Sequence, residues 1–279
     1  MAGTLFVVAT PIGNLSDLSR RAEQTLRDAD CVAAEDTRRT RALLTHFGIE
    51  GKTVVKLDAN ATDRAIESVV LRLSAGETVA LVTDAGTPSV SDPGTALVRR
   101  AALENVPVVA IPGPSAVTAA VSASGLVEGP FSFLGFASRH GEKRRRFVRR
   151  VRDAEEPVVF FEAPARVRRT LADLAEAMPD RAACVVRELT KIHEEVLRGT
   201  LSELASRKFE ERGEFTVVVA GTDPALAPEA SDLDVDRFIG ERLDAGDPPR
   251  TVADALASVL GSPRREIYAK VLAAVRARG

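Results

Sequence analysis

The chain contains few of the residues that form disulfide frameworks or metal sites. Its 279 residues include two cysteines and three histidines. Two cysteines cannot build a disulfide framework, and Cys31 and Cys184 each lie in an apolar run, so we expect two buried thiols. The sequence has no CxxC pair and no cluster of histidine with cysteine, so we expect no metal site.

Long hydrophobic runs and a strong net charge are also missing. No stretch of about 20 uninterrupted apolar residues occurs, so we expect no membrane-spanning helix. The first residues lack a basic segment and their apolar run is short, so we expect no signal peptide and a cytoplasmic protein. The net charge of -2 gives no overall signature of nucleic-acid binding, so any such function has to reside in a local patch.

The composition is that of an ordinary globular protein, with 45% hydrophobic and 28% charged residues. In the first half, short apolar segments alternate with helical ones. Strands are expected at 4–10, 31–34, 53–57, 78–84 and 107–111, and helices at 16–29, 37–46, 61–75, 94–105 and 114–124. This alternation predicts an α/β domain with a mostly parallel sheet and helices on both faces.

The same alternation resumes after Gly129-Pro130 and predicts a second α/β domain. Strands are expected at 157–162, 183–189 and 214–220, with 131–136 as a strand or connector and a polar loop leading into 194–199, and helices at 139–152, 164–177 and 201–208. A Pro/Ala-rich segment and a strand-free tail follow. We therefore expect domains at 1–128 and 129–222, a linker at 223–233 and a small helical domain at 234–279.

Three loops that follow apolar strands are candidates for one ligand site. They are Pro11–Gly13, Thr83–Gly94 and Pro112–Ala116. Each alone has an ordinary explanation as a tight turn or a helix start. Together they favour one crevice, because ligands of open α/β sheets bind beyond the carboxyl ends of the strands. The loops lack GxGxxG and GxxxxGK[ST], so they suit a nucleoside-bearing ligand without a pyrophosphate.

Charged residues follow other strands. Glu35 and Asp36 come after the second strand, where a carboxylate either caps the next helix or contributes to a site at the same sheet edge. Phe161–Arg166 and Arg187–Glu195 follow strands of the second domain, with solvated loop charge as the alternative. The segment 139–152 carries eight Lys and Arg against one Glu. A solvated helix face is the usual explanation, but so dense a charge also favours an anionic partner.

Several segments carry a family resemblance. They are ATPIGNLSDLSRRA, AAEDTRRTRALL, LVTDAGTPSVSDPG, AIPGPSAVTAAVSASGL, FSFLGF, FFEAPARV and VVRELTKIHEE, in that order. Over residues 3–221 the chain resembles the ribosomal RNA small subunit methyltransferase I family, of the tetrapyrrole-methylase superfamily (class III methyltransferases). One departure is Lys56–Thr62, where the family often has a stretch rich in His, Asn and Glu.

The resemblance implies a fold, a cofactor and a reaction. It implies two α/β domains of the tetrapyrrole-methylase type, often with a small C-terminal helical domain, and a homodimer. It implies S-adenosylmethionine as cofactor and methylation of a cytidine ribose 2′-hydroxyl in the 16S rRNA of the small ribosomal subunit. The cofactor contacts expected on this basis are Pro11, Gly13, Asp84, Ala85, Gly86, Thr87, Ser91, Pro112, Gly113, Ser115, Ala116, Glu162, Ala163, Pro164 and Ala220.

Such a reaction needs a group that draws the proton from a ribose hydroxyl, and an RNA-binding surface. Candidate bases are Asp36, Glu188, Glu194 and Lys191, of which a lysine would need a lowered pKa. RNA contacts are expected from Arg139, Lys143, Arg144, Arg145, Arg146, Arg149 and Arg166.

Two rival functions stay open at this point. One is a methyltransferase of a tetrapyrrole or another small molecule on the same fold, since fold does not determine substrate. The other is a non-catalytic regulator that binds nucleic acid through the tail. Residues 250–262 resemble a helix-turn-helix, with a dimer-packing or capping subdomain as the alternative.

Overall fold

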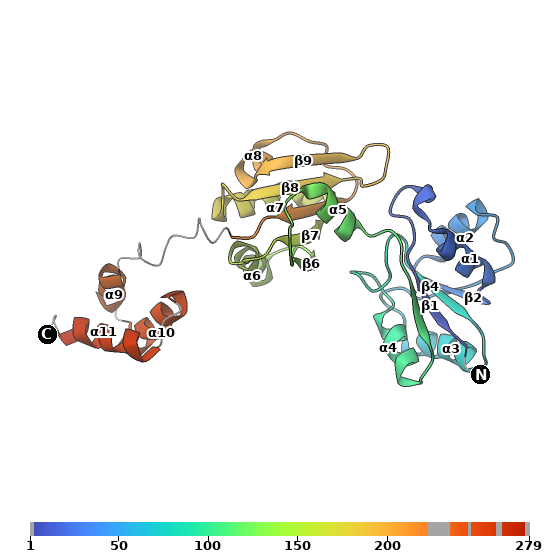
Figure 1. The fold of residues 1–279 in the computed structure, drawn as a ribbon, viewed down its shortest axis with the longest axis horizontal. Helices are drawn as coiled ribbons and strands as arrows, with labels where there is room; N and C mark the ends of the chain where they lie inside the picture. The colour runs from blue at the N-terminus through green and yellow to red at the C-terminus, as the bar shows by residue number, and fades with distance from the viewer. Residues whose placement is uncertain (1–2, 223–234, 245–246, 261–263, 277–279) are drawn as a thin grey trace. The chain divides into compact units, whose positions relative to one another are not determined.

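The computed structural model describes residues 3–222, 235–244, 247–260 and 264–276. The chain forms two compact units, residues 1–221 and 222–279. The first unit contains two five-stranded sheets. Both sheets alternate with helices, which confirms the predicted α/β class (Figure 1).

The first sheet is parallel throughout, as predicted. Its order is β3-β2-β4-β1-β5, with β1 (Leu5–Val8), β2 (Cys31–Ala34), β3 (Thr53–Lys56), β4 (Val79–Val82) and β5 (Val108–Ile111). Every side chain of β2 and β4 is buried, which explains their continuous apolar sequences. All five strands run the same way, so their carboxyl ends share one edge.

Helices cover both faces of this sheet (Figure 1). On one face lie α1 (Arg20–Asp28) and α2 (Thr37–His46), and on the other α3 (Asp63–Ser74) and α4 (Thr95–Leu103). The single helix expected over 16–29 is divided, because Ser19 caps α1 and a separate 3₁₀ turn, η1 (Leu15–Asp17), precedes it.

The second sheet is mixed. Its order is β6-β7-β10-β8-β9, with β6 (Ser132–Phe136), β7 (Val158–Glu162), β8 (Ala182–Arg187), β9 (Glu195–Thr200) and β10 (Phe215–Val219). Only β6 and β7 pair in parallel, and β10 runs antiparallel to both of its neighbours. The start of β10 therefore lies beside the end of β7, with Phe215 opposite Glu162.

Helices also cover both faces of the second sheet. One face packs on α6 (Gly141–Arg152), α7 (Pro164–Ala177) and α8 (Leu201–Ser206). The other packs on α5 (Ala116–Ser124), through Val117 and Ala120. Because α5 precedes the division expected at residues 128 and 129, this helix ties the first half of the unit to the second.

The second unit contains α9 (Val235–Asp244), α10 (Pro249–Leu260) and α11 (Arg264–Arg276). Its core includes Ile239, Val252, Leu256, Ile267 and Val271, so the expected helical tail packs on itself. The expected linker 223–233 lies outside the described residues. None of the described helices has the length and apolarity needed to cross a membrane.

Candidate functional site

The three loops singled out in the sequence meet at one edge of the first sheet. Thr10 and Gly86 exchange both backbone hydrogen bonds, at 2.8 and 3.0 Å, which joins the first loop to the second. The Thr87 hydroxyl donates to the Pro114 carbonyl at 3.3 Å, which joins the second loop to the third. The loops therefore form one connected surface and are not three unrelated turns.

The end of β2 joins the same surface. The Thr83 hydroxyl donates to Glu35 Oε2 at 2.6 Å, and the Asp36 amide donates to Asp84 Oδ1 at 3.0 Å. Arg39, in the first turn of α2, forms an ion pair with Asp84 at 3.3 Å. Acidic groups from two strand ends are thus held side by side.

A cavity of about 360 Å³ lies between this surface and the second sheet. Its walls combine aromatic and aliphatic side chains with six charged ones. The lining residues are Ile12, Glu35, Arg39, Asp84, Ala85, Ser91, Asp92, Ala116, Phe136, Phe161, Glu162, Ala163, Pro164, Gly213, Glu214, Phe215 and Thr216. We name this space the inter-sheet cavity.

The crowded carboxylates perturb one another. Burial, followed by repulsion from Glu35, raises the pKa of Asp92 to about 6. The same two causes raise the pKa of Asp84, although the Asp36 amide and Arg39 oppose them. The cavity therefore favours a cationic ligand, and Asp92 exchanges a proton close to neutral pH.

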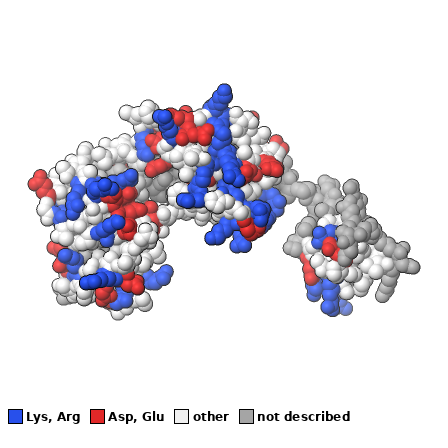
Figure 2. Space-filling view, turned by 180° about the vertical axis from the view of Figure 1, so that it is seen from behind, with Lys and Arg blue, Asp and Glu red and all other residues white. Residues whose placement is uncertain are grey.

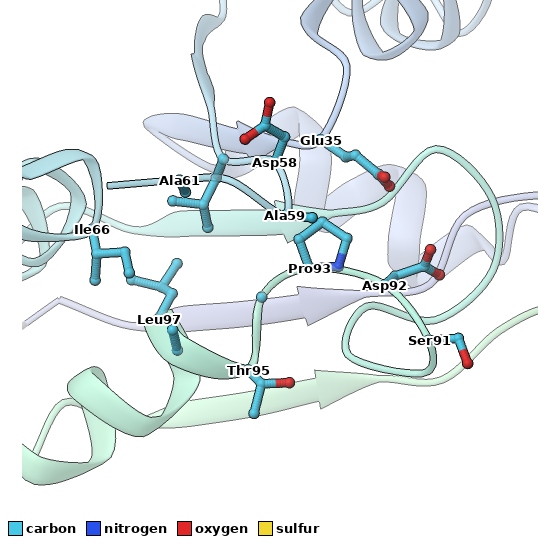
Figure 3. A pocket seen from close by; sticks show the side chains of 13 residues that line it. Glu35, Asp58, Ala59, Ala61, Ile66, Ser91, Asp92, Pro93, Thr95 and Leu97 are labelled. Atoms are coloured by element: carbon cyan, nitrogen blue, oxygen red, sulfur yellow. The ribbon is translucent and has the colours of Figure 1, made fainter. Parts of the chain in front are cut away.

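A second cavity of about 420 Å³ adjoins the first and shares Glu35, Ser91 and Asp92 with it. In Figure 3 Ile66 and Leu97 lie at one end of this space, and the carboxylates of Glu35 and Asp92 lie at the other. Its walls include Asp58, Ala59 and Ala61, from the stretch where the sequence departs from the family. Glu35 and Asp92 thus face two spaces at once.

The loops around the inter-sheet cavity have a strained backbone. Ser89 and Ser91 have φ values of 71° and 65°, and Glu188 and Thr190 have values of 51° and 64°. Non-glycine residues in this region cost about 1–3 kcal/mol each and concentrate at functional sites. The Asn14 amide donates to the Thr190 hydroxyl at 3.0 Å, so the strained segment 188–190 packs on the first loop.

About half of the expected cofactor contacts line the cavity. They are Asp84, Ala85, Ser91, Ala116, Glu162, Ala163 and Pro164. Four others do not line the cavity but hold its loops together. Gly86 and Thr87 form hydrogen bonds to neighbouring loops, Gly13 packs on Lys191, and Gly113 packs on Ala9. Pro11 lines an adjacent recess that also contains Asp84, while Pro112 and Ser115 lie outside the lining.

Ala220 lies at the wrong end of its strand for this site. The sequence predicted a cofactor contact at the end of β10, which would lie at the cavity if β10 ran parallel to β7. Because β10 is antiparallel to β7, Val219 sits opposite Val158 and the Ala220 amide donates to the Ala182 carbonyl. Glu214 and Phe215, at the start of β10, line the cavity instead.

The Glu162 carboxylate is occupied by the protein. It is 1% exposed, and it accepts hydrogen bonds from the Ala163 amide at 2.8 Å and from the Thr170 hydroxyl at 2.5 Å. Arg166 forms an ion pair with it at 2.6 Å. This group therefore fixes the start of α7 beside the cavity and has little capacity left for a ligand.

None of the four predicted bases lines the inter-sheet cavity. Asp36 is the N-cap of α2 and accepts from the amides of Arg38 and Arg39, so the capping explanation holds for it. Glu194 accepts from the Thr190 amide at 2.5 Å. The pair Glu188 and Lys191 is joined at 2.9 Å.

Lys191 is also unsuited to act as a base. Its burial lowers its pKa, but hydrogen bonds to Glu188 and Glu214 outweigh that effect and raise the pKa above its ordinary value. Asp92 and Glu35 lie in segments that the sequence singled out, but neither was predicted as a candidate base. The signal was present for both, since each lies in a segment that follows a buried strand.

Two of the predicted RNA contacts are engaged inside the protein. Arg144 is 7% exposed, and it donates to Asp173 at 2.8 Å and to Thr170 at 3.1 Å. Its position on α6 points into the core, so the prediction of an RNA contact is wrong for this residue. Arg166 is committed to Glu162, as described above.

Comparison with known proteins gives a family assignment. Residues 4–205 match the family described as tetrapyrrole (corrin/porphyrin) methylases. A Xylella fastidiosa protein named ribosomal RNA small subunit methyltransferase I is 43% identical over 271 residues, covering 95% of this chain and 98% of its own. A Thermotoga maritima protein of the same name is 42% identical over 224 residues, covering 79% of this chain and 100% of its own.

Solved structures share the fold at low sequence identity. A diphthine synthase has a TM-score of 0.60 at 20% identity, covering 78% of this chain and 90% of its own. A Thermus thermophilus uroporphyrin-III C-methyltransferase, complexed with S-adenosylhomocysteine, has a TM-score of 0.55 at 20% identity, covering 78% and 97%. With the sequence identities above, these findings place the chain in the ribosomal RNA small subunit methyltransferase I family of the tetrapyrrole methylases.

Proposed function

We propose that this protein transfers a methyl group from S-adenosylmethionine to the 2′-hydroxyl of a cytidine in 16S rRNA. The observation that carries this proposal is the inter-sheet cavity, where loops from successive strands meet carboxylates and aromatic rings. The names of relatives about 40% identical over most of the chain support an rRNA substrate.

The residues present fit S-adenosylmethionine. When bound, it supplies a methyl group activated by a positively charged sulfur. Asp84 and Glu214 suit the cationic groups and ribose hydroxyls of the cofactor, and Arg39 suits its carboxylate. Apolar side chains suit the adenine: Ile12, Phe161 and Phe215.

The chain's own contribution is orientation and proton removal. Holding the reacting groups in line can supply about 7–11 kcal/mol of the barrier. We assign Asp92 as the group that accepts the ribose proton, because it faces both cavities. With a pKa of about 6 it is mostly a carboxylate at pH 7, the form that can accept a proton.

A tetrapyrrole substrate is the nearest rival. The relatives about 40% identical are named as rRNA methyltransferases, whereas the uroporphyrin-III methyltransferase shares the fold at 20% identity, and this favours RNA. A non-catalytic regulator is disfavoured for another reason, since it leaves the strained, converging loops without a role.

Two further features belong to this proposal. A homodimer is supported by β5, an edge strand whose Val108 and Val109 side chains are 38% and 39% exposed. A second copy would cover such a surface.

The cytoplasm is the proposed place of action, because ribosomal subunits are assembled there.

The test is to map ribose methylation of 16S rRNA in a strain that lacks the protein and in the same strain with the gene restored. We expect one cytidine 2′-O-methyl group to disappear and return. An Asp92→Asn copy should restore the protein but not the methyl group. If every ribose methyl group persists in the deletion strain, the rRNA assignment is wrong.

A further inference from the structure

The cations of α6 fall into two sets. Arg145 and Arg149 both bind Glu142, each at 2.8 Å, and Arg152 binds Asp153 at 2.7 Å. In the part of the chain that the structure describes, Lys143, Arg146 and Arg150 have no such carboxylate partner. The helix therefore separates neutralised cations from unneutralised ones.

The unneutralised cations share one face of the helix. Positions 143, 146 and 150 are three and four residues apart, the spacing that stacks side chains on one side of an α-helix. All three line a groove of about 290 Å³, together with Leu134, Phe136, Ser138 and Phe147. We name this space the α6 groove. Figure 2 shows Lys and Arg side chains forming a band over the part of the molecule that carries the second sheet.

Phe136 connects this groove to the inter-sheet cavity. It lines both spaces, and it is 55% exposed. Its ring packs edge-on against Phe161, with centroids 5.5 Å apart, so the ring is supported from below. A large exposed aromatic ring at the end of β6, beside three unneutralised cations of α6, is an unusual combination for a solvent-exposed surface.

We propose that the α6 groove binds a single-stranded nucleotide next to the methylated one. Its base would stack on Phe136, and its phosphates would contact Lys143, Arg146 and Arg150. The inference rests on the proposed function, because it makes Phe136 the point where the RNA strand turns from the groove toward the donor cavity.

Charge and shape favour RNA over other partners. Three like charges on one helix face repel one another, and a polyanion removes that repulsion. Single-stranded RNA supplies both phosphates and flat bases, and proteins bind it by combining cationic grooves with aromatic stacking. The contacts carry no base-specific hydrogen bond, so the groove should hold the strand without reading its sequence.

The chain offers a matched control for the charge test. The double variant Arg146→Gln/Arg150→Gln removes two groove cations, and Arg145→Gln/Arg149→Gln removes two cations already bound to Glu142. Both change the net charge by the same amount on the same helix. Binding of a fluorescein-labelled oligocytidylate of about ten nucleotides would be measured by anisotropy at several salt concentrations.

We expect the groove variant to lose at least about tenfold in affinity. The slope of log affinity against log salt concentration should also become shallower by about 1.4, because each of the two lost phosphate contacts contributes about 0.7. The control variant should stay within about threefold of the parent protein. Equal losses in both variants would mean that only overall charge matters, and would overturn the inference.

Stacking is tested separately. Phe136→Ala should weaken oligocytidylate binding about tenfold in the absence of cofactor, and Phe136→Trp should retain it. A loss in Phe136→Ala that Trp does not restore would contradict stacking. Sedimentation of both variants tests whether the Phe136 ring lies in a dimer interface. If either variant becomes a monomer where the parent protein is a dimer, a second copy covers the ring and the inference is wrong.

These outcomes are distinguishable from failure of the proposed function. Binding of S-adenosylhomocysteine and methylation of small ribosomal subunits by the parent protein test the function itself. If both occur and the groove variant matches its control, the inference alone falls. If the parent protein binds RNA through the groove but methylates no subunit, the rRNA assignment falls and the groove stands.

Discussion

Two aspartates close to the candidate site, Asp36 and Asp92, have different roles in this protein. Asp36 begins α2, where its carboxylate accepts two backbone amides and is spent on capping. Asp92 lies in a loop, half enclosed among other acids, and has a raised pKa. The difference arises from what surrounds each carboxylate and not from the residue type.

The first prediction compares Asp92→Asn with Asp36→Asn. Asn cannot accept the ribose proton, so Asp92→Asn should lower kcat by about 10²–10⁴-fold. Asparagine caps a helix as well as aspartate does, so Asp36→Asn should leave kcat within about twofold. Single-turnover methylation of small ribosomal subunits measures both.

The pH profile gives an independent check on Asp92. Its carboxylate form is the active one and its pKa is raised to about 6, so the rate should rise with pH through about 6 and level off above it. The residual rate of Asp92→Asn should lack this rise. A profile that keeps the same rise in the variant would assign the titration to another group.

The second prediction concerns stability at Arg144. Replacing it by Met leaves the buried carboxylate of Glu162 without the guanidinium 3.8 Å away and removes the hydrogen bond to Asp173. Glu162 keeps its ion pair with Arg166, so the expected cost is that of losing hydrogen bonds to a charged partner, about 1.5–3 kcal/mol. Arg145→Met, on the exposed side of the same helix, should cost under about 1 kcal/mol. Urea unfolding measures both, and equal costs would contradict the buried assignment.

At the scale of elements, local sequence pattern predicted the first sheet well. Its strands are short apolar runs such as Val79–Val82, each followed by a loop and a helix, which is the pattern of a parallel sheet. The convergence of three loops follows from the same regularity. The local pattern did not predict the strand directions of the second sheet. There β10 lies between β7 and β8 and is antiparallel to both, and these pairings join segments far apart in the sequence.

The candidate site shows the same limit. Placing Ala220 in it required a parallel β10, whereas the antiparallel strand brings Phe215 and Glu214 to the cavity. Glu35 and Asp36 are neighbours, and nothing in their order states which one caps the helix and which one faces the ligand. The structure separates the two roles, because Asp36 accepts from the Arg38 and Arg39 amides whereas Glu35 accepts from the Thr83 hydroxyl and lines the cavity.

The third prediction concerns the contact between the first loop and the segment after β8. A methyl group at position 13 would overlap the Lys191 side chain and lie 2.9 Å from the Thr190 hydroxyl and 3.0 Å from the Leu189 carbonyl. Gly13→Ala should therefore displace one loop and weaken S-adenosylhomocysteine binding by about tenfold or more, the change that a misplaced site can cause.

Gly129→Ala is the matched control, because the added methyl group there meets nothing within 4 Å. Its ligand affinity should equal that of the parent protein. Isothermal titration with S-adenosylhomocysteine compares the two. Unchanged affinity in Gly13→Ala would mean that Lys191 moves aside without consequence for the site.

At the scale of the whole molecule, the chain consists of two units with separate cores. The α/β unit carries both cavities, and the helical unit buries Ile239, Leu256 and Val271 among its own helices. The Thermotoga maritima relative aligns over its full length with 79% of this chain. A relative of that length shows that the family can include proteins shorter than this one.

The last prediction is that the donor's product stabilises the α/β unit alone. A ligand that binds only the folded state stabilises it by about 2.7 kcal/mol at a concentration 100 times its Kd. Because the lining residues all belong to the α/β unit, S-adenosylhomocysteine should slow amide hydrogen exchange around residues 84–94 and 162–164 and leave Val252 and Val271 unchanged. Exchange measured by mass spectrometry on the full chain resolves both regions. Equal protection of α10 and α11 would mean that the helical unit closes on the ligand or unfolds together with the α/β unit, and the separation of the two cores in stability would then be wrong.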